Sequence, residues 1–259
     1  MENEILVIGI IKPVNHEEDD MMHERQQLLD LLEQNSIPYD KVEHPWPRDL
    51  FVSFNGKILE EKEHYRYADG GFVIVRPEFT LICDEVSKKA IISGRDKPEK
   101  RYEKLINLYG PNFHILPAPN VKLNEAMPPH IDLVILPIPE RGVLFADRRY
   151  TMDNRRTITN LCNKLNLNLE LVDHDYKNPS WPCNSVIINN DGRLFAITNS
   201  DKNEHFISRL NSYGITSLAT PYSANCQQGG GIFCSTNTCP RDKFSQVEKL
   251  CRDYNVILV

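Results

Sequence analysis

The fold is set by a short stretch of sequence that occurs twice. Residues 46–58 read WPRDLFVSFNGKI, and residues 181–194 read WPCNSVIINNDGRL. Both copies have Trp-Pro, then Asp or Asn two residues later, then a strand, an Asn/Gly turn, a basic residue and a second strand. Such a turn between strand-forming residues is typical of a tight β-hairpin. The two copies therefore predict a repeated unit that contains a hairpin and follows a helix and a short strand.

Segments of helical and of strand character alternate along the rest of the chain. Two further pairs of strand candidates, Val73–Val75 with Phe79–Cys83 and Leu133–Leu136 with Gly142–Phe145, flank turns that contain proline. Hairpins of this kind do not belong between the parallel strands of a doubly wound sheet. Helical periodicity appears in five segments: 21–35, 97–109, 153–165, 200–213 and 240–253.

The repeat and the alternation together predict the fold class. A unit of roughly fifty residues fits about five times into the 259 residues. A ring of such units buries the apolar face of each unit against its neighbours, as in a propeller. Because no linker or low-complexity tract divides the chain, we expect one α/β domain over residues 1–259, a five-unit pseudo-symmetric α/β propeller. Corresponding loops of all units would then meet at one end of the central axis.

Composition and charge restrict the possible partners. Charged residues make up 25% and hydrophobic residues 41% of the chain, which is typical of a globular protein and excludes a disordered or fibrous one. The net charge of −6 argues against nucleic acid or an anionic membrane as the main partner. The apolar runs are too short to span a bilayer, and the seven cysteines show no pairing rhythm, which indicates free thiols in a reducing compartment. We expect a cytoplasmic protein, and homo-oligomerisation is compatible with the sequence.

A glycine-rich segment carries the strongest candidate nucleophile. Gly229-Gly230-Gly231 precedes Cys234, which we expect on a short strand. Successive glycines let a substrate approach the backbone closely, so the thiol of Cys234 would have room to attack a bound molecule. The alternative is a bulged turn around a buried structural cysteine.

A second candidate motif is His130-Ile131-Asp132, which follows two prolines. On a strand, the alternation of side chains would place His130 and Asp132 on the same face. An imidazole can act first as an acid and then as a base near neutral pH. The alternative is a strand end at which both side chains face solvent.

Two further motifs supply carboxylates. We expect Asp49 at the start of a buried strand, where an unpaired carboxylate is costly, so it should meet a cation. That cation could be a bound molecule, Arg48 or another arginine. Asp69 precedes Gly70-Gly71 and could equally be a turn aspartate. Asn184 occupies the position of Asp49 in the second copy of the repeat, which makes it a further candidate pocket residue.

No motif of the sequence indicates a metal or a cofactor. The chain lacks C-x-x-C, H-E-x-x-H and any repeated His/Cys pair at metal-ligand spacing. It also lacks a Walker loop, G-x-G-x-x-G and G-x-S-x-G, so nucleotide binding and serine-hydrolase chemistry have no support. We therefore expect neither a metal nor a cofactor.

Taken in chain order, these motifs resemble those of a known family. Trp46–Asp49, Asp69–Gly71, His130–Asp132 and Gly229–Cys234 are similar to the motifs of the guanidino-group-modifying, or pentein, superfamily. That family includes arginine deiminase, agmatine deiminase, dimethylarginine dimethylaminohydrolase and the amidinotransferases. Its fold is a five-unit pseudo-symmetric α/β propeller, which agrees with the repeat. The resemblance covers residues 46–238.

The resemblance implies a role for each candidate residue. Cys234 would be the nucleophile and His130 the general acid and base, while Asp49 and Asp132 would clamp a guanidinium group and Asp69 would orient His130. The sequence departs from the family at Asp69, where the deiminases and dimethylargininases usually have a glutamate. The implied activity is metal-independent hydrolysis of arginine or a derivative through a covalent thiouronium intermediate. The products would be a ureido compound and ammonia or an alkylamine.

Three other functions stay open at this point. An amidinotransferase would use an amine in place of water as the second acceptor. A non-catalytic binding protein of the same fold would not need both His130 and Cys234. A cysteine hydrolase of amides would have little use for paired Asp49 and Asp132, because an amide is neutral.

Overall fold

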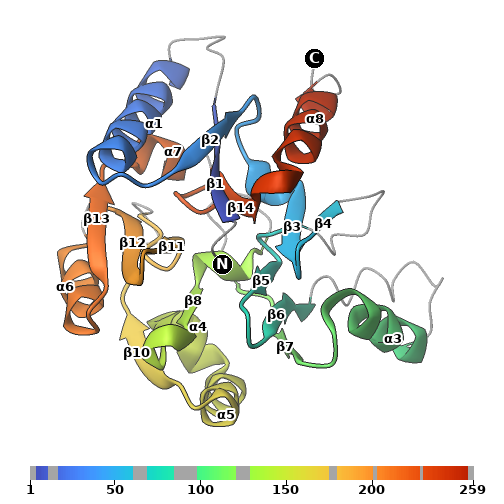
Figure 1. The fold of residues 1–259 in the computed structure, drawn as a ribbon. Coiled ribbons are helices and arrows are strands. Elements are labelled where there is room, and N and C mark those ends of the chain that lie inside the picture. Colours follow the sequence, from blue (N-terminus) through green and yellow to red (C-terminus); the bar gives the residue numbers. More distant parts are fainter. Residues whose placement is uncertain are drawn as a thin grey trace.

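The computed structural model describes residues 4–10, 17–60, 69–84, 98–120, 129–174, 180–200, 203–227 and 230–255. These residues have a mixed α/β fold with five small sheets, none of which closes into a barrel. Figure 1 shows the five sheets placed around the middle of the molecule, with the helices on the outside. Among the described helices, none has the length and apolar character needed to cross a bilayer.

Four of the five described sheets share one pattern of strands. Each has an antiparallel pair of strands, and a third strand runs parallel to the middle one after a helical connection. The four sheets are, in spatial order, β14 (Thr236–Pro240), β1 (Glu4–Gly9) and β2 (Tyr39–Val42); β5 (Val73–Val75), β6 (Thr80–Cys83) and β7 (Phe113–Leu116); β8 (Ile135–Ile138), β9 (Val143–Asp147) and β10 (Asn168–Val172); β11 (Val186–Asn190), β12 (Arg193–Asn199) and β13 (Thr216–Thr220).

The fifth sheet is the hairpin of the first repeat copy. It pairs β3 (Phe51–Phe54) with β4 (Lys57–Glu60) and has no third strand among the described residues. Both predicted hairpin turns are confirmed, because Asn55 and Gly56, like Asp191 and Gly192, have positive φ angles between 49° and 80°. Two residues of positive φ give the turn that matches the twist of paired strands.

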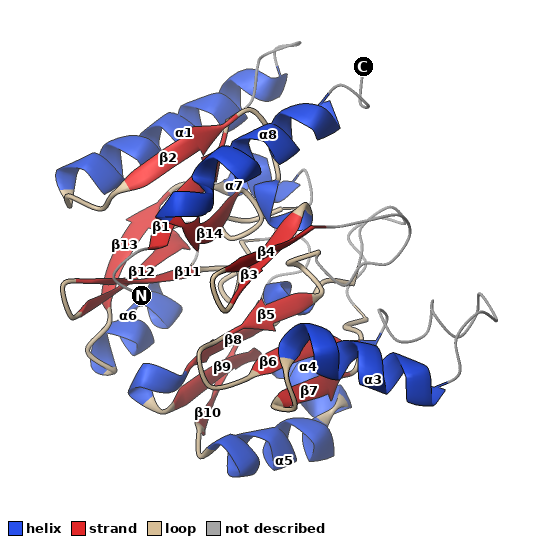
Figure 2. Ribbon diagram, turned by 45° about the vertical axis from the view of Figure 1, so that its right-hand side comes forward, coloured by secondary structure: helices blue, strands red, loops and turns tan. Residues whose placement is uncertain are grey.

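Each of the five predicted helical segments contains a helix. The helices of the described residues are α1 (Glu17–Gln34), α3 (Pro98–Tyr109), α4 (Arg148–Asp153), α5 (Arg155–Leu165), α6 (Glu204–Ser212), α7 (Ser223–Gln227) and α8 (Phe244–Asn255). Gly110 and Gly214 follow the ends of α3 and α6 with φ angles of 70°, as expected of a glycine that ends a helix. The apolar faces of the helices pack on the sheets, as the burial of Leu28, Leu32, Ile158 and Leu210 shows. Figure 2 shows the helices lying along the outer sides of the strands.

The segments that carry the predicted site residues differ from the predictions in one respect. We expected His130 and Asp132 on a strand, but Ile131–Leu133 form a 3₁₀ turn ahead of β8. The turn forms because the N–H groups of Ile131 and Asp132 both donate to the carbonyl oxygen of Gly71, a contact that does not extend a strand.

The strand predictions for Asp49 and Cys234 are wrong for a similar reason. Pro47–Asp49 form a 3₁₀ turn with Pro47 at its first position, and β3 begins only at Phe51. Cys234 lies in a turn that is closed by the bond from the N–H of Ser235 to the carbonyl oxygen of Gly231, ahead of β14. Each of these turns leads directly into the first strand of a different sheet.

Candidate active site

The imidazole of His130 forms an ion pair with Asp69. The Nε2 atom of His130 lies 3.4 Å from Oδ2 of Asp69, and both residues are buried. The N–H of Gly71 donates a hydrogen bond of 2.9 Å to the other oxygen of Asp69. A Cβ atom on Gly71 would lie 2.0 Å from Nδ1 of His130, so only glycine lets the two segments approach so closely. The shorter aspartate therefore still reaches the imidazole that the family resemblance assigns to it.

The ionisation of His130 follows from this pair. Burial lowers the pKa of His130, but the charge of Asp69 and the contact with it more than offset this effect and raise the pKa to about 9. At neutral pH the imidazole is therefore protonated and able to donate a proton.

Two further carboxylates lie close to His130. Asp132 is fully buried, and neither of its oxygens accepts a hydrogen bond from a described residue. The same holds for Oδ1 of Asp49. Burial and the neighbouring negative charges raise the pKa of Asp49 to about 7 and that of Asp132 to about 6. Unsatisfied buried carboxylates are costly, and a cation with several N–H donors would remove that cost.

Arg48 lies beside these carboxylates and pairs with Asp132 rather than with Asp49. Its Nε atom is 3.8 Å from Oδ2 of Asp132, its Nη2 donates to the carbonyl oxygen of Val73, and its guanidinium carbon lies 3.9 Å from the centre of the Phe233 ring. The sequence named Arg48 only as a possible partner of Asp49. Its actual partner depends on how three separate segments pack, and no signal in the motif indicates it.

The thiol of Cys234 is held by Asn184. The Nδ2 atom of Asn184 lies 3.4 Å from Sγ of Cys234, and its Oδ1 accepts hydrogen bonds from the N–H groups of Phe233 (2.9 Å) and Cys234 (3.3 Å). A Cβ atom on Gly231 would lie 2.5 Å from Oδ1 of Asn184, which explains the glycine at that position. The structure thus places Asn184 at the candidate nucleophile, as its position in the repeat suggested.

Cys234 is only 4% exposed, and its environment favours the thiol over the thiolate. Burial raises the pKa of Cys234 well above its usual range, and the charges of Asp132 and Asp49 raise it further. A cation held by these carboxylates would act in the opposite direction, since nearby positive charge favours the thiolate.

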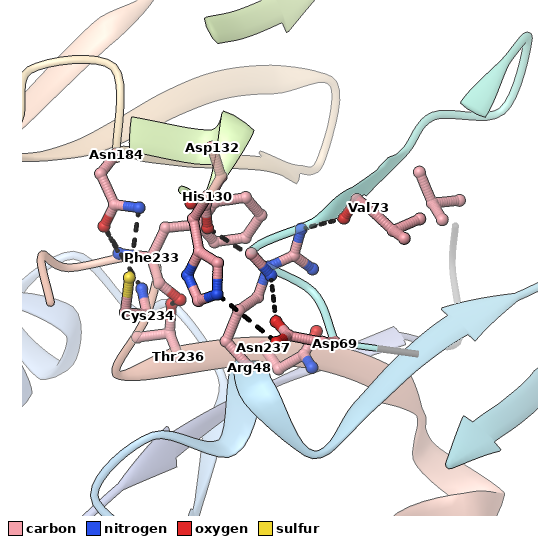
Figure 3. A network of polar contacts seen from close by, with 12 residues as sticks. Arg48, Asp69, Val73, His130, Asp132, Asn184, Phe233, Cys234, Thr236 and Asn237 are labelled. Carbon is pink, nitrogen blue, oxygen red and sulfur yellow. Dashed lines mark hydrogen bonds and ion pairs between the residues drawn. The ribbon is translucent and has the colours of Figure 1, made fainter. Parts of the chain in front are cut away.

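The structure brings all six predicted site residues into one region. Figure 3 shows the imidazole of His130 between the Cys234–Asn184 contact and the Asp69 carboxylate, with Arg48 and Asp132 beside it. The predicted residues come from the segments ahead of β3, β5, β8, β11 and β14, one for each sheet. Gly229 of the predicted glycine-rich segment lies outside the described residues.

Three of these side chains could also hold a metal ion. Asp49, Asp69 and His130 each offer one ligand atom, and these atoms lie within 4.8 Å of one another. Oxygen and imidazole donors suit several divalent cations. Metal-ligand spacing in the sequence could not indicate this group, because its members come from three separate segments.

Comparisons with known proteins identify the fold. No family model matches the chain, and no curated protein matches its sequence. Among solved structures, the N-terminal domain of ArgZ, an arginine dihydrolase from the ornithine-ammonia cycle in cyanobacteria, has 10% identical residues and a TM-score of 0.62, over 91% of this chain and 97% of that one.

Two other solved structures resemble the chain to the same degree. SxtG, an amidinotransferase of saxitoxin biosynthesis from Microseira wollei, has 11% identity and a TM-score of 0.64, over 89% of this chain and 92% of that one. Agmatine deiminase from C. jejuni has 13% identity and a TM-score of 0.61, over 92% and 93%. The chain has the pentein fold. At this identity the likeness establishes the fold alone, and the pentein architecture agrees with the convergence of five segments at one site.

Proposed function

We propose that this pentein protein hydrolyses a guanidino compound, arginine or a derivative, through a covalent intermediate on Cys234. The observation that carries the proposal is the grouping of a cysteine, a protonated histidine and buried carboxylates that lack hydrogen-bond partners among the described residues. We also infer that the five sheets are the five units of a pseudo-symmetric ring, because each contributes one segment to this group.

The carboxylates of Asp49 and Asp132 would bind the guanidinium group. A guanidinium presents N–H donors in one plane, and two carboxylates can grip these donors and fix the central carbon. The permanent positive charge of the group would lower the pKa of the Cys234 thiol, whose proton then leaves to solvent. Substrate binding would in this way produce the thiolate that attacks it.

Bond making and breaking would follow in two halves. Sγ of Cys234 attacks the central carbon, and protonated His130 gives its proton to the departing amine as the C–N bond breaks. Neutral His130 then takes a proton from a water molecule, whose oxygen attacks the thiouronium carbon. The C–S bond breaks, which leaves a ureido product, the thiolate and protonated His130. Asp69 would hold the imidazole in place throughout.

Transfer of the amidino group to an amine is the second candidate function. It would use the same first half-reaction, with an amine in place of water in the second. The similarity to SxtG, an amidinotransferase, keeps this candidate open.

A screen over guanidino compounds tests the proposal. We expect a colorimetric assay for ureido products to find activity with at least one of arginine, methylarginines, agmatine and guanidino acids. Cys234→Ser should abolish that activity, whereas Cys226→Ser should retain it, because Cys226 lies outside the group although it too is buried. Activity that depends on an added amine would instead favour the transferase, and full activity of Cys234→Ser would refute both.

A further inference from the structure

A second cavity lies at the other end of the strands that carry the candidate active site. It has a volume of about 270 Å³. Its lining includes the later residues of β3 and β5 and the turns that follow β3, β5 and β8, whereas the active-site residues precede these strands. Such a volume is close to the lower limit of ordinary small-molecule sites. None of the six predicted active-site residues lines this cavity.

Two arginines line the inner part of the cavity and are anchored to the same strand. Arg48 donates through Nη2 to the carbonyl oxygen of Val73, and Arg76 donates through Nη1 to that of Val75. These carbonyl groups point away from β6, because Phe72 and Arg76 make the bonds to that side. Both guanidinium groups therefore lie along the free edge of β5.

Each arginine retains an unused terminal nitrogen. Nη1 of Arg48 and Nη2 of Arg76 have no hydrogen-bond partner within the described part of the chain, although Arg76 also binds the carbonyl oxygen of Pro137. The two groups are close enough that Arg48 contributes to lowering the pKa of Arg76 to about 10, after the larger effect of burial. Two neighbouring guanidinium groups with free donors are suited to bind a carboxylate.

Two carboxylates lie on the exposed side of the same cavity. Glu4 and Glu140 both line it and are exposed, in contrast to buried Arg48 and half-buried Arg76. Neither glutamate forms an ion pair with another described residue. Side chains such as Phe54, Val75 and Ile187 supply the apolar part of the lining. The cavity therefore has positive charge inside, negative charge toward solvent and an apolar wall.

We propose that this cavity binds a zwitterionic α-amino acid with a short apolar side chain. The carboxylate of the ligand lies against Arg48 and Arg76, its ammonium group faces Glu140 and Glu4, and its side chain packs on the apolar wall. A simple anion would leave the two glutamates without a partner, and a simple cation would meet two arginines. The proposal does not depend on the proposed hydrolysis, because it concerns other residues and a ligand without a guanidine.

Calorimetric titration of the full chain with L-norvaline tests the proposal. Pentanoate and butylamine are the controls, because each has one of the two charged groups of norvaline and a similar alkyl chain. We expect norvaline to bind at least about tenfold more tightly than either control, since each lost contact is a hydrogen bond to a charged group. Equal binding of pentanoate would show a plain anion site and overturn the proposal, as would no binding of norvaline.

Variants locate the binding site. Arg76→Met and Glu140→Gln should each weaken norvaline at least about tenfold, whereas the exposed matched controls Arg193→Met and Glu103→Gln should leave it unchanged. Glu140 is exposed, so its variant tests the site even where Arg76→Met does not fold. Asp49→Asn should bind norvaline as the parent protein does. Loss of binding in Asp49→Asn, or normal binding in Glu140→Gln, would contradict the placement of the ligand in this cavity.

Discussion

The two copies of the Trp-Pro segment hold equivalent places but present different side chains to the site. In the first copy, Asp49 contributes a carboxylate whose Oδ1 has no partner among the described residues. In the second, Asn184 uses its amide fully, with one contact to Sγ of Cys234 and two bonds from backbone N–H groups. The two positions thus face the same region, one toward a bound cation and the other toward the nucleophile.

The tryptophans of the two copies differ in the same sense. Trp46 is half-buried and packs between Arg25, 5.0 Å from its ring, and the backbone of Gly230. Trp181 is 1% exposed, has a φ angle of 43° and stacks on His174 at 4.4 Å. A positive φ is rare for a bulky residue and marks strain. The repeat therefore conserves the path of the chain into the strand, while the side chains have diverged toward separate tasks.

The largest expected effect comes from making the two segments alike. Asp49→Asn would replace a charged partner of the substrate by a neutral amide. We expect kcat/KM for the guanidino substrate to fall by at least about 100-fold, because a lost hydrogen bond between charged groups costs up to about 3 kcal/mol. Steady-state kinetics measures this, with the exposed Asp153→Asn as a control. A fall of less than threefold would remove Asp49 from substrate binding.

The reverse exchange, Asn184→Asp, should have a smaller effect. It adds a negative charge beside Sγ of Cys234 and removes the amide donor, although the new carboxylate can still accept the N–H groups of Phe233 and Cys234. Both changes raise the pKa of the thiol, so we expect about tenfold slower turnover. The rate of alkylation of Cys234 against pH gives a second measure, and it should shift to higher pH. An unchanged alkylation profile would contradict the role of Asn184.

Dependence on pH distinguishes the titrating Asp49 from the neutral Asn184. Binding of a cation requires the ionised form of Asp49, whose pKa is raised to about 7, so kcat/KM should fall about fivefold from pH 7 to pH 6. Asp132, with a pKa of about 6, should steepen the fall below that. Above pH 9 the rate should fall again as His130 loses its proton. A profile that is flat from pH 5 to pH 8 would show that these carboxylates do not bind the substrate.

The smallest effect concerns stability. A carboxylate whose pKa is raised by folding stabilises the protein while it is protonated and loses this contribution as pH rises through the folded pKa, here about 7. Asp49→Asn should therefore raise the free energy of unfolding at pH 8 by about 1–2 kcal/mol and change it little at pH 5. Denaturant unfolding at the two pH values measures the difference. A loss of stability at pH 8 would mean that the Asp49 carboxylate is already paired in the fold.

The sequence predicted the parts of this structure that depend on local chemistry. The turns at Asn55-Gly56 and Asp191-Gly192 and the ends of α3 and α6 depend on residues that tolerate a positive φ, so they are readable from the chain. The candidate site residues were found because they occur in short motifs in a characteristic order. The position of Asn184 followed from the repeat alone.

The remaining features depend on contacts between distant segments. The turn at His130 forms because Gly71 supplies a carbonyl oxygen to Ile131, and nothing near His130 in the sequence indicates that partner. Asn184 and Cys234 lie 50 residues apart, so their contact appears only when two sheets come together. The pairing of Arg48 with Asp132 instead of its neighbour Asp49 has the same origin.

Alkylation by a matched pair of reagents tests the central claim most directly, which is that Cys234 faces a site built for a planar cation. In both 2-chloroacetamidine and 2-chloroacetamide, Sγ displaces chloride, but only the amidine carries a positive charge. We predict that the amidine modifies Cys234 at least about 100-fold faster than the amide, since only it can pair with Asp49 and Asp132, and that Asp49→Asn removes most of this preference. Equal rates for the two reagents, or preferential modification of another cysteine, would contradict the account.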